Sequence, residues 1–110
     1  MLKVLEKLKN PIKAVFLTAT PIGIKPILYY ERDNSFCGFN FDWDIIKNKA
    51  KNFEVFHSDN DPFVCLKNGE ELAKKLNVKL NFIPNAGHFS VKTSGYITFP
   101  DLLEKIKIIL

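Results

Sequence analysis

Residues 53–89 decide the fold, and they read FEVFHSDNDPFVCLKNGEELAKKLNVKLNFIPNAGHF. The apolar run Phe53–His57 predicts a buried strand. Asn68–Leu76 has glutamates in its first turn and lysines in its last turn, which agrees with the dipole of a helix. Lys79–Ile83 predicts a second strand, which Pro84 ends. A strand, a helix and a strand in this order predict a parallel pair joined by a right-handed crossover.

The same alternation continues on both sides of this stretch. Leu2, Leu5 and Leu8 recur at helical spacing, and Asn10-Pro11 ends that pattern because proline cannot continue a helix. The expected elements are helices at 2–8, at 42–50 with Asp42 as cap, and from Pro100 onward, a strand at 13–18, and a long loop at 21–42. We therefore predict an α/β protein with three parallel strands and flanking helices.

An acid and a histidine each follow a predicted strand, and both are candidates for catalysis. Asp61 follows the strand at 53–57, and His88 follows the strand at 79–83. Open α/β sheets place their sites beyond the carboxyl ends of the strands, and the order Asp before His fits the α/β-hydrolase triad. Asp61 would accept the Nδ1–H of His88, the general base. Asp59 is expected to be an exposed loop acid, and His57 to pack locally.

Singly, an Asp-Pro and a Gly-His are ordinary turn formers, but their joint placement favours a triad. The nucleophile of that triad is not evident. None of the four serines, Ser35, Ser58, Ser90 and Ser94, lies in a Gly-x-Ser-x-Gly turn. Cys65 lies on the loop of Asp61 itself, so a structural thiol is favoured over a nucleophile, as for Cys37. With 110 residues, the chain is also short for a complete hydrolase sheet.

Three segments resemble the retinoblastoma-binding protein 9 family of small serine hydrolases: Phe56–Val64, Gly69–Leu76 and Asn85–Phe89. Phe41–Ile46 matches that family's tryptophan-containing segment. The resemblance implies that residues 1–110 form one partial domain, the C-terminal half of an α/β-hydrolase fold, with the nucleophile turn and the oxyanion-hole amides before Met1. It implies cleavage of an ester or amide through an acyl-enzyme, with no metal or cofactor. The N-terminal half would be a possible partner chain.

Aromatic residues near these motifs are candidates for an apolar substrate pocket, because ligand sites are lined mostly by apolar side chains. We assign Trp43, Phe63 and Phe89 to it.

Composition limits the other possible functions. An apolar share of 46% argues against disorder, and a net charge of +4 alone does not indicate a nucleic-acid partner. Lys47, Lys49 and Lys51 would serve a nucleic-acid binder, but such a run is more often a solvated helix face. The absence of a signal-peptide pattern or a long apolar run favours a cytoplasmic chain with no membrane partner. A non-catalytic remnant, or one chain of a split protein, is the main alternative function.

Overall fold

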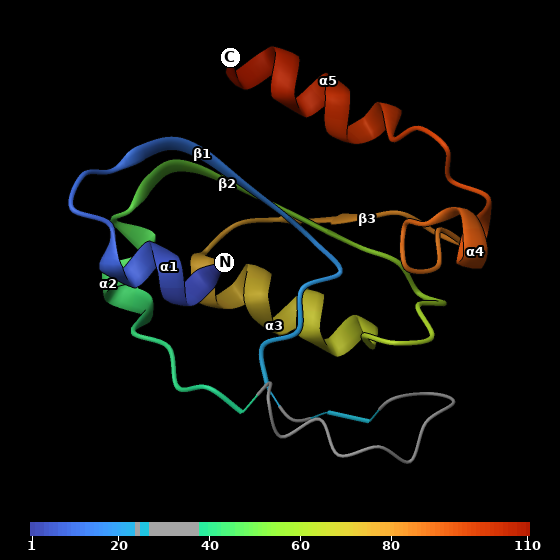
Figure 1. Ribbon diagram of the computed structural model, residues 1–110, viewed down its shortest axis with the longest axis horizontal. Helices are drawn as coiled ribbons and strands as arrows, with labels where there is room; N and C mark the ends of the chain where they lie inside the picture. Colours follow the sequence, from blue (N-terminus) through green and yellow to red (C-terminus); the bar gives the residue numbers. More distant parts are fainter. Residues whose placement is uncertain (24, 27–37) are drawn as a thin grey trace.

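The computed structural model describes residues 1–23, 25–26 and 38–110. Its strands form one parallel sheet in the order β1-β2-β3, with helices on both faces (Figure 1). The strands are β1 (Ile12–Thr18), β2 (Ala50–His57) and β3 (Leu80–Phe82), and the helices are α1 (Leu2–Lys7), α2 (Trp43–Lys47), α3 (Leu66–Leu76), α4 (Val91–Ser94) and α5 (Pro100–Ile109). The predicted α/β class with three parallel strands is confirmed.

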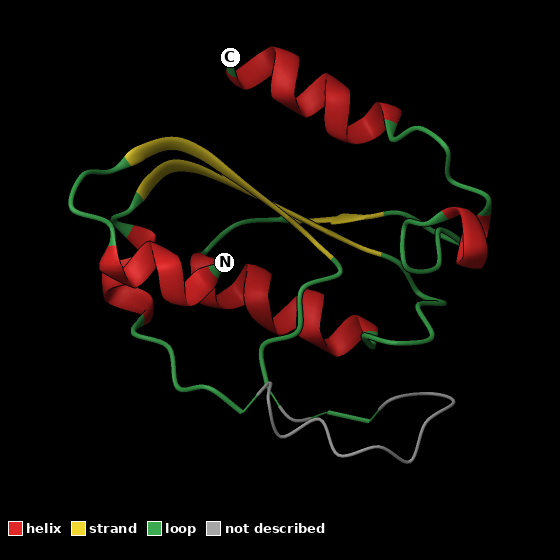
Figure 2. Ribbon diagram, viewed as in Figure 1, coloured by secondary structure: helices red, strands yellow, loops and turns green. Residues whose placement is uncertain are grey.

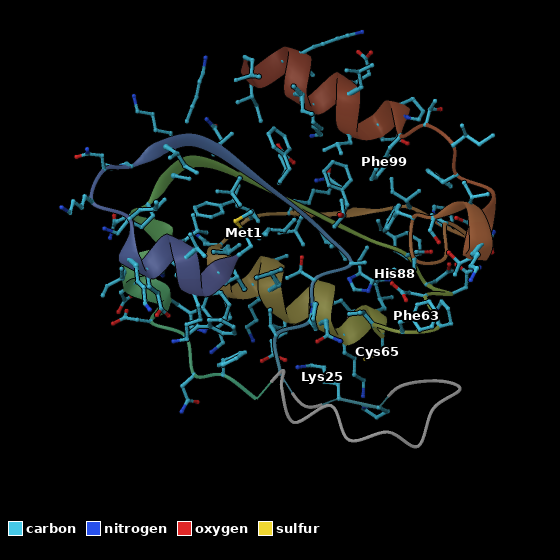
Figure 3. All side chains as sticks on the ribbon, viewed as in Figure 1. Met1, Lys25, Phe63, Cys65, His88 and Phe99 are labelled. Carbon is cyan, nitrogen blue, oxygen red and sulfur yellow. The ribbon has the colours of Figure 1, made fainter. Side chains whose placement is uncertain are left out.

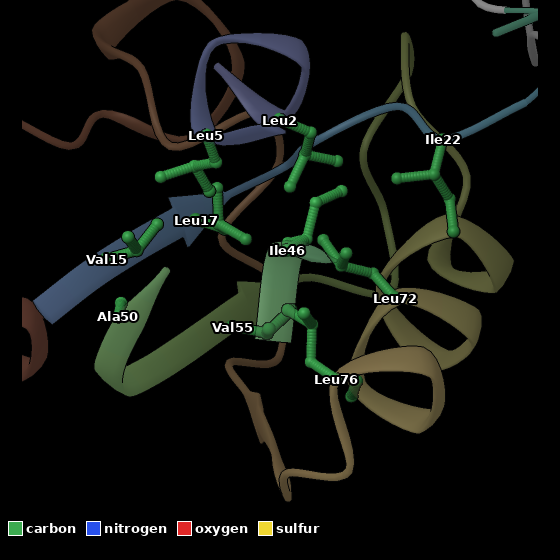
Figure 4. Close-up of a cluster of buried hydrophobic side chains, with 11 residues drawn as sticks. Leu2, Leu5, Val15, Leu17, Ile22, Ile46, Ala50, Val55, Leu72 and Leu76 are labelled. Carbon is green, nitrogen blue, oxygen red and sulfur yellow. The ribbon is translucent and has the colours of Figure 1, made fainter. Parts of the chain in front are cut away.

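The main core lies between the sheet and α1, α2 and α3 (Figures 2 and 4). Alternate residues of a strand point to opposite faces, so Val15 and Leu17 of β1 face this layer together. The leucines of α3 recur at helical spacing and pack against them. The buried cluster includes Leu2, Leu5, Val15, Leu17, Ile22, Ile46, Ala50, Val55, Leu72, Ala73 and Leu76.

Helix α5 lies over the other face of the sheet and covers it loosely (Figure 2). Phe99, which precedes α5, packs edge to face on Phe56 of β2 at 5.2 Å. No residue of α5 is buried, and Ile108 is 78% exposed. An open cleft of about 320 Å³ is lined by residues of α5 and by the ends of β2 and β3. This face of the sheet is therefore much less protected than the face that carries the core.

Strand β1 is an edge strand in the described part of the chain. It pairs with β2 in the register Ile12↔Ala50 to Thr18↔Phe56, and the sheet order gives it no neighbour on its other side. Its backbone groups on that side remain available to a further strand.

Several element boundaries differ from the predicted ones, and the helix predicted at 42–50 ends at Lys47, because residue 50 already belongs to β2. Strand β2 begins at Ala50, because its first residues pair with β1 although their side chains are poor strand formers. Helix α3 begins at Leu66, and helix α4 was not predicted at all. Of the predicted loop at 21–42, residues 24 and 27–37 lie outside the described residues, as does Cys37. Within the described residues, no helix has both the length and the apolar character needed to cross a membrane.

Candidate active site

The carboxylate of Asp61 is buried in the loop after β2, where its own backbone holds it. One oxygen, Oδ1, accepts the N–H groups of Phe63 at 2.8 Å and of Val64 at 2.9 Å. An aspartate readily forms such bonds with the residues that follow it, because its short side chain reaches the next turn of backbone. The other oxygen, Oδ2, therefore has a fixed direction.

Oδ2 of Asp61 lies 2.8 Å from Nδ1 of His88, while the Asp61 side chain is 0% exposed and the His88 side chain 37% exposed. A carboxylate accepts the hydrogen bond, so the proton resides on Nδ1 of the ring. Nε2 is then the unprotonated atom of the neutral ring, ready to take a proton. Phe63 packs edge to face on the ring at 5.3 Å, and Figure 3 shows both side chains at the end of the sheet where β2 and β3 finish.

Three consecutive residues of the acid loop hold three consecutive N–H groups of the turn that precedes His88. Ser58 Oγ accepts the N–H of residue 86 at 2.9 Å, Asp59 Oδ1 that of residue 85 at 2.8 Å, and Asn60 Oδ1 that of residue 87 at 2.7 Å. The Ser58 hydroxyl also donates to Asn60 Oδ1 at 2.8 Å. We call Ser58, Asp59 and Asn60 the clamp. It ties the loop of the acid directly to the turn of the histidine.

The histidine turn needs unusual backbone angles. Asn85, Gly87 and Phe89 all have positive φ, at 57°, 53° and 49°. Two constraints favour glycine at position 87: its positive φ, and the lack of space for a Cβ, which would lie 2.8 Å from the side chain of Thr93. The Thr93 hydroxyl accepts the N–H of His88 at 2.9 Å. Helix α4, which supplies Thr93, is thus part of the support for the histidine.

Comparison with known proteins identifies the family. The family model described as serine hydrolase matches residues 2–107. The chain belongs to the serine hydrolase family. The ydeN gene product of B. subtilis has the same fold, with a TM-score of 0.83 at 23% identity over 98% of this chain and 57% of that chain. At that identity the likeness concerns the fold alone. The serine hydrolase chain thus spans 57% of the length of that protein. No curated protein matches it.

The three predicted pocket residues of this serine hydrolase chain lie in three different places relative to His88. Phe63 contacts the His88 ring. Phe89 follows His88 in sequence, and its ring stacks on Phe99 at 4.8 Å, within an aromatic cluster. Trp43 is not brought to the site, because α2 precedes β2 and so lies at the amino ends of the strands (Figure 1). There it packs on Phe41 at 5.2 Å.

Among the described residues, no serine hydroxyl is hydrogen-bonded to the His88 ring. Ser58 belongs to the clamp, Ser90 bonds the Thr93 hydroxyl, and Ser94 donates to the carbonyl of residue 90. Ser35 lies outside the described residues. The Cys65 thiol is half-buried and unpaired with another cysteine, and its sulfur accepts a bond from Asn68 at 3.4 Å. The described residues contain no cluster of three potential metal ligands.

Proposed function

We propose that this chain supplies the acid and the base of a serine hydrolase that cleaves a carboxylic ester or amide. The observation that carries the proposal is the 2.8 Å contact between Oδ2 of the buried Asp61 and Nδ1 of His88. It fixes the neutral tautomer in which Nε2 can accept a proton, and the ring is partly open to solvent.

In the proposed reaction, a serine hydroxyl attacks the carbonyl carbon of the substrate while its proton moves to Nε2 of His88. The imidazolium then passes that proton to the leaving alcohol or amine, and an acyl-enzyme remains. Water attacks the acyl group by the same route, which releases the acid and regenerates the serine. Asp61 holds the ring in orientation and stabilises its positive charge at both stages. No metal or organic cofactor takes part in this scheme.

The proposal places the serine in a segment outside these 110 residues, either earlier in the same polypeptide or on a separate chain. Two observations support this arrangement: β1 has an open edge in the described structure, and the chain spans 57% of the ydeN product. The chain would then be one partial domain of a compact hydrolase of the retinoblastoma-binding protein 9 type, acting in the cytoplasm.

The decisive experiment joins the chain to the segment encoded immediately upstream, by co-expression or as one polypeptide. We expect a serine-directed fluorophosphonate to label that segment and a nitrophenyl ester to be hydrolysed, whereas the 110-residue chain alone does neither. His88→Ala should abolish nearly all turnover and leave the complex assembled. Labelling of the isolated chain would show that a serine within it is the nucleophile.

A non-catalytic role is the second candidate, because no described serine hydroxyl is bonded to His88. The chain would then bind a partner protein through the open edge of β1. Absence of hydrolysis from an assembled, folded complex would favour this role over the first.

A further inference from the structure

The second histidine of the chain is buried beside the acid loop, and the scheme above gives it no part. His57 is the last residue of β2 and is 0% exposed. Its Nε2 lies 2.7 Å from the carbonyl oxygen of Val64. A carbonyl can only accept, so Nε2 of His57 carries the proton and donates it.

The remaining ring nitrogen of His57 has no hydrogen-bond partner in the described part of the chain. Nδ1 is buried and makes no hydrogen bond with any described residue. Helix α3 closes that side of the ring, since a Cβ at Gly69 would lie 2.6 Å from both Cβ and Nδ1 of His57. A buried acceptor without a donor is unfavourable, and an apolar ring would fill the same space without that penalty. What the histidine adds at this position is therefore its donor to Val64.

Val64 links His57 to the proposed catalytic acid. Its carbonyl accepts from His57, and its N–H donates to Oδ1 of Asp61 at 2.9 Å. Both backbone groups of Val64 are thus held, one by the end of the strand and one by the carboxylate. If the carbonyl were released, the backbone that fixes Oδ1 could shift, and the direction of Oδ2 would shift with it.

We propose that His57 is a positioning residue of the hydrolase, which acts through the Val64 backbone to set the orientation of the Asp61 carboxylate toward His88. An effect of His57 on turnover rests on the proposed function. Its effect on the Asp61–His88 contact can be measured independently of any hydrolysis.

The test compares His57→Gln with His57→Asn. A glutamine side chain can place its amide nitrogen near the position of Nε2 and keep the bond to Val64, whereas an asparagine is too short to reach it. The chain has two histidines, so ¹⁵N labelling of histidine rings leaves His88 as the only labelled residue in either variant. Leu5→Ala is the control, because it opens the core at α1 without touching the acid loop.

We expect His57→Gln to keep the wild-type Nδ1–H signal of His88, and His57→Asn to move that signal toward that of an imidazole without a carboxylate partner. In the assembled hydrolase, His57→Asn should lower kcat by up to about 100-fold with little change in KM, because the reacting groups are misplaced. Leu5→Ala should leave both measurements as in the wild type.

The proposal would be overturned by a wild-type His88 signal in His57→Asn, or by equal damage from His57→Gln and His57→Asn. A change of the same kind in Leu5→Ala would also do so, since it would reveal a general effect of lost stability. If the assembled wild type hydrolyses nothing, the proposed function fails, yet the ¹⁵N spectra still decide whether His57 orients the pair.

Discussion

The side-chain oxygen of Asn60 accepts the backbone N–H of Gly87 at 2.7 Å, so the loop of the acid holds the turn of the histidine directly. Asn60 itself is exposed, whereas Gly87 is buried. The bond therefore gives the buried N–H group of Gly87 its hydrogen-bond acceptor. It makes the geometry of His88 depend on a residue that has no role in the proposed chemistry.

Removing this acceptor should destabilise the chain. We expect Asn60→Ala to lower the free energy of unfolding by about 1–3 kcal/mol, because it leaves a buried donor unpaired. Asn60→Asp is the matched control, since its carboxylate keeps an acceptor at the same distance from the backbone. Urea unfolding monitored by tryptophan fluorescence measures both. Equal stability of Asn60→Ala and the wild type would show that water replaces the lost bond.

The two aspartates of the acid loop should respond differently to the same substitution. In the assembled hydrolase, Asp61→Asn should lower kcat by about 10⁴-fold, because an amide cannot hold His88 in the required tautomer. Asp59→Asn should have little effect, since its amide oxygen can still accept the N–H of Asn85. Ester hydrolysis under saturating substrate measures both rates. The reverse ranking would assign the acid to Asp59.

Gly69 should be intolerant of even the smallest side chain. Gly69→Ala would place its Cβ 2.6 Å from the buried His57, so we expect a loss of about 1–3 kcal/mol of stability from overpacking. Gly23→Ala is the control, because among the described residues the new Cβ would approach only the side-chain nitrogen of Lys25, at 3.1 Å. Both variants replace a glycine by alanine, so both lower the conformational entropy of the unfolded chain by a similar amount. Thermal unfolding should separate them, and similar melting temperatures would mean that α3 can move away from β2.

The open edge of β1 and the exposed apolar residues at the C-terminal end of the chain should make the isolated chain self-associate. Unpaired strand edges bind other strands, and Ile108 and Leu110 add apolar surface at 78% and 70% exposure. We expect sedimentation velocity to show association that grows with concentration. Adding the upstream segment should replace it with a single complex. A monodisperse monomer of the isolated chain at high concentration would contradict this expectation.

The sequence predicted those features of the fold that depend on local patterns. The strand at 53–57 and the helix with Leu72 and Leu76 follow from apolar spacing, and Asp42 does cap α2 through its bond to the N–H of Ile45. The start of β2 was missed because Ala50-Lys-Asn owes its strand conformation to pairing with β1. Local propensity carries no information about that pairing.

The proximity of Asp61 and His88 was also predictable, because carboxyl ends of parallel strands meet at one edge of the sheet. The residues that hold this pair in place could not be predicted from the sequence. Ser58 and Asn60 act through backbone groups that become neighbours only after the sheet forms, and Thr93 lies in a four-residue helix without a clear sequence signal. Trp43 was assigned to the pocket by residue type, which does not reveal at which end of a strand a helix lies.

Asp61 and His88 are 27 positions apart, and both lie within the β2-α3-β3 unit and the turn that follows it, as does the clamp. The entropy lost in closing a loop grows slowly with its length, and α3 orders 11 of the residues between the pair. One segment of the chain therefore carries both residues, and β1 holds that segment in place through its pairing with β2. Under the proposed function, the acid and the base are therefore encoded together in one short stretch of the gene, whereas the nucleophile is encoded elsewhere.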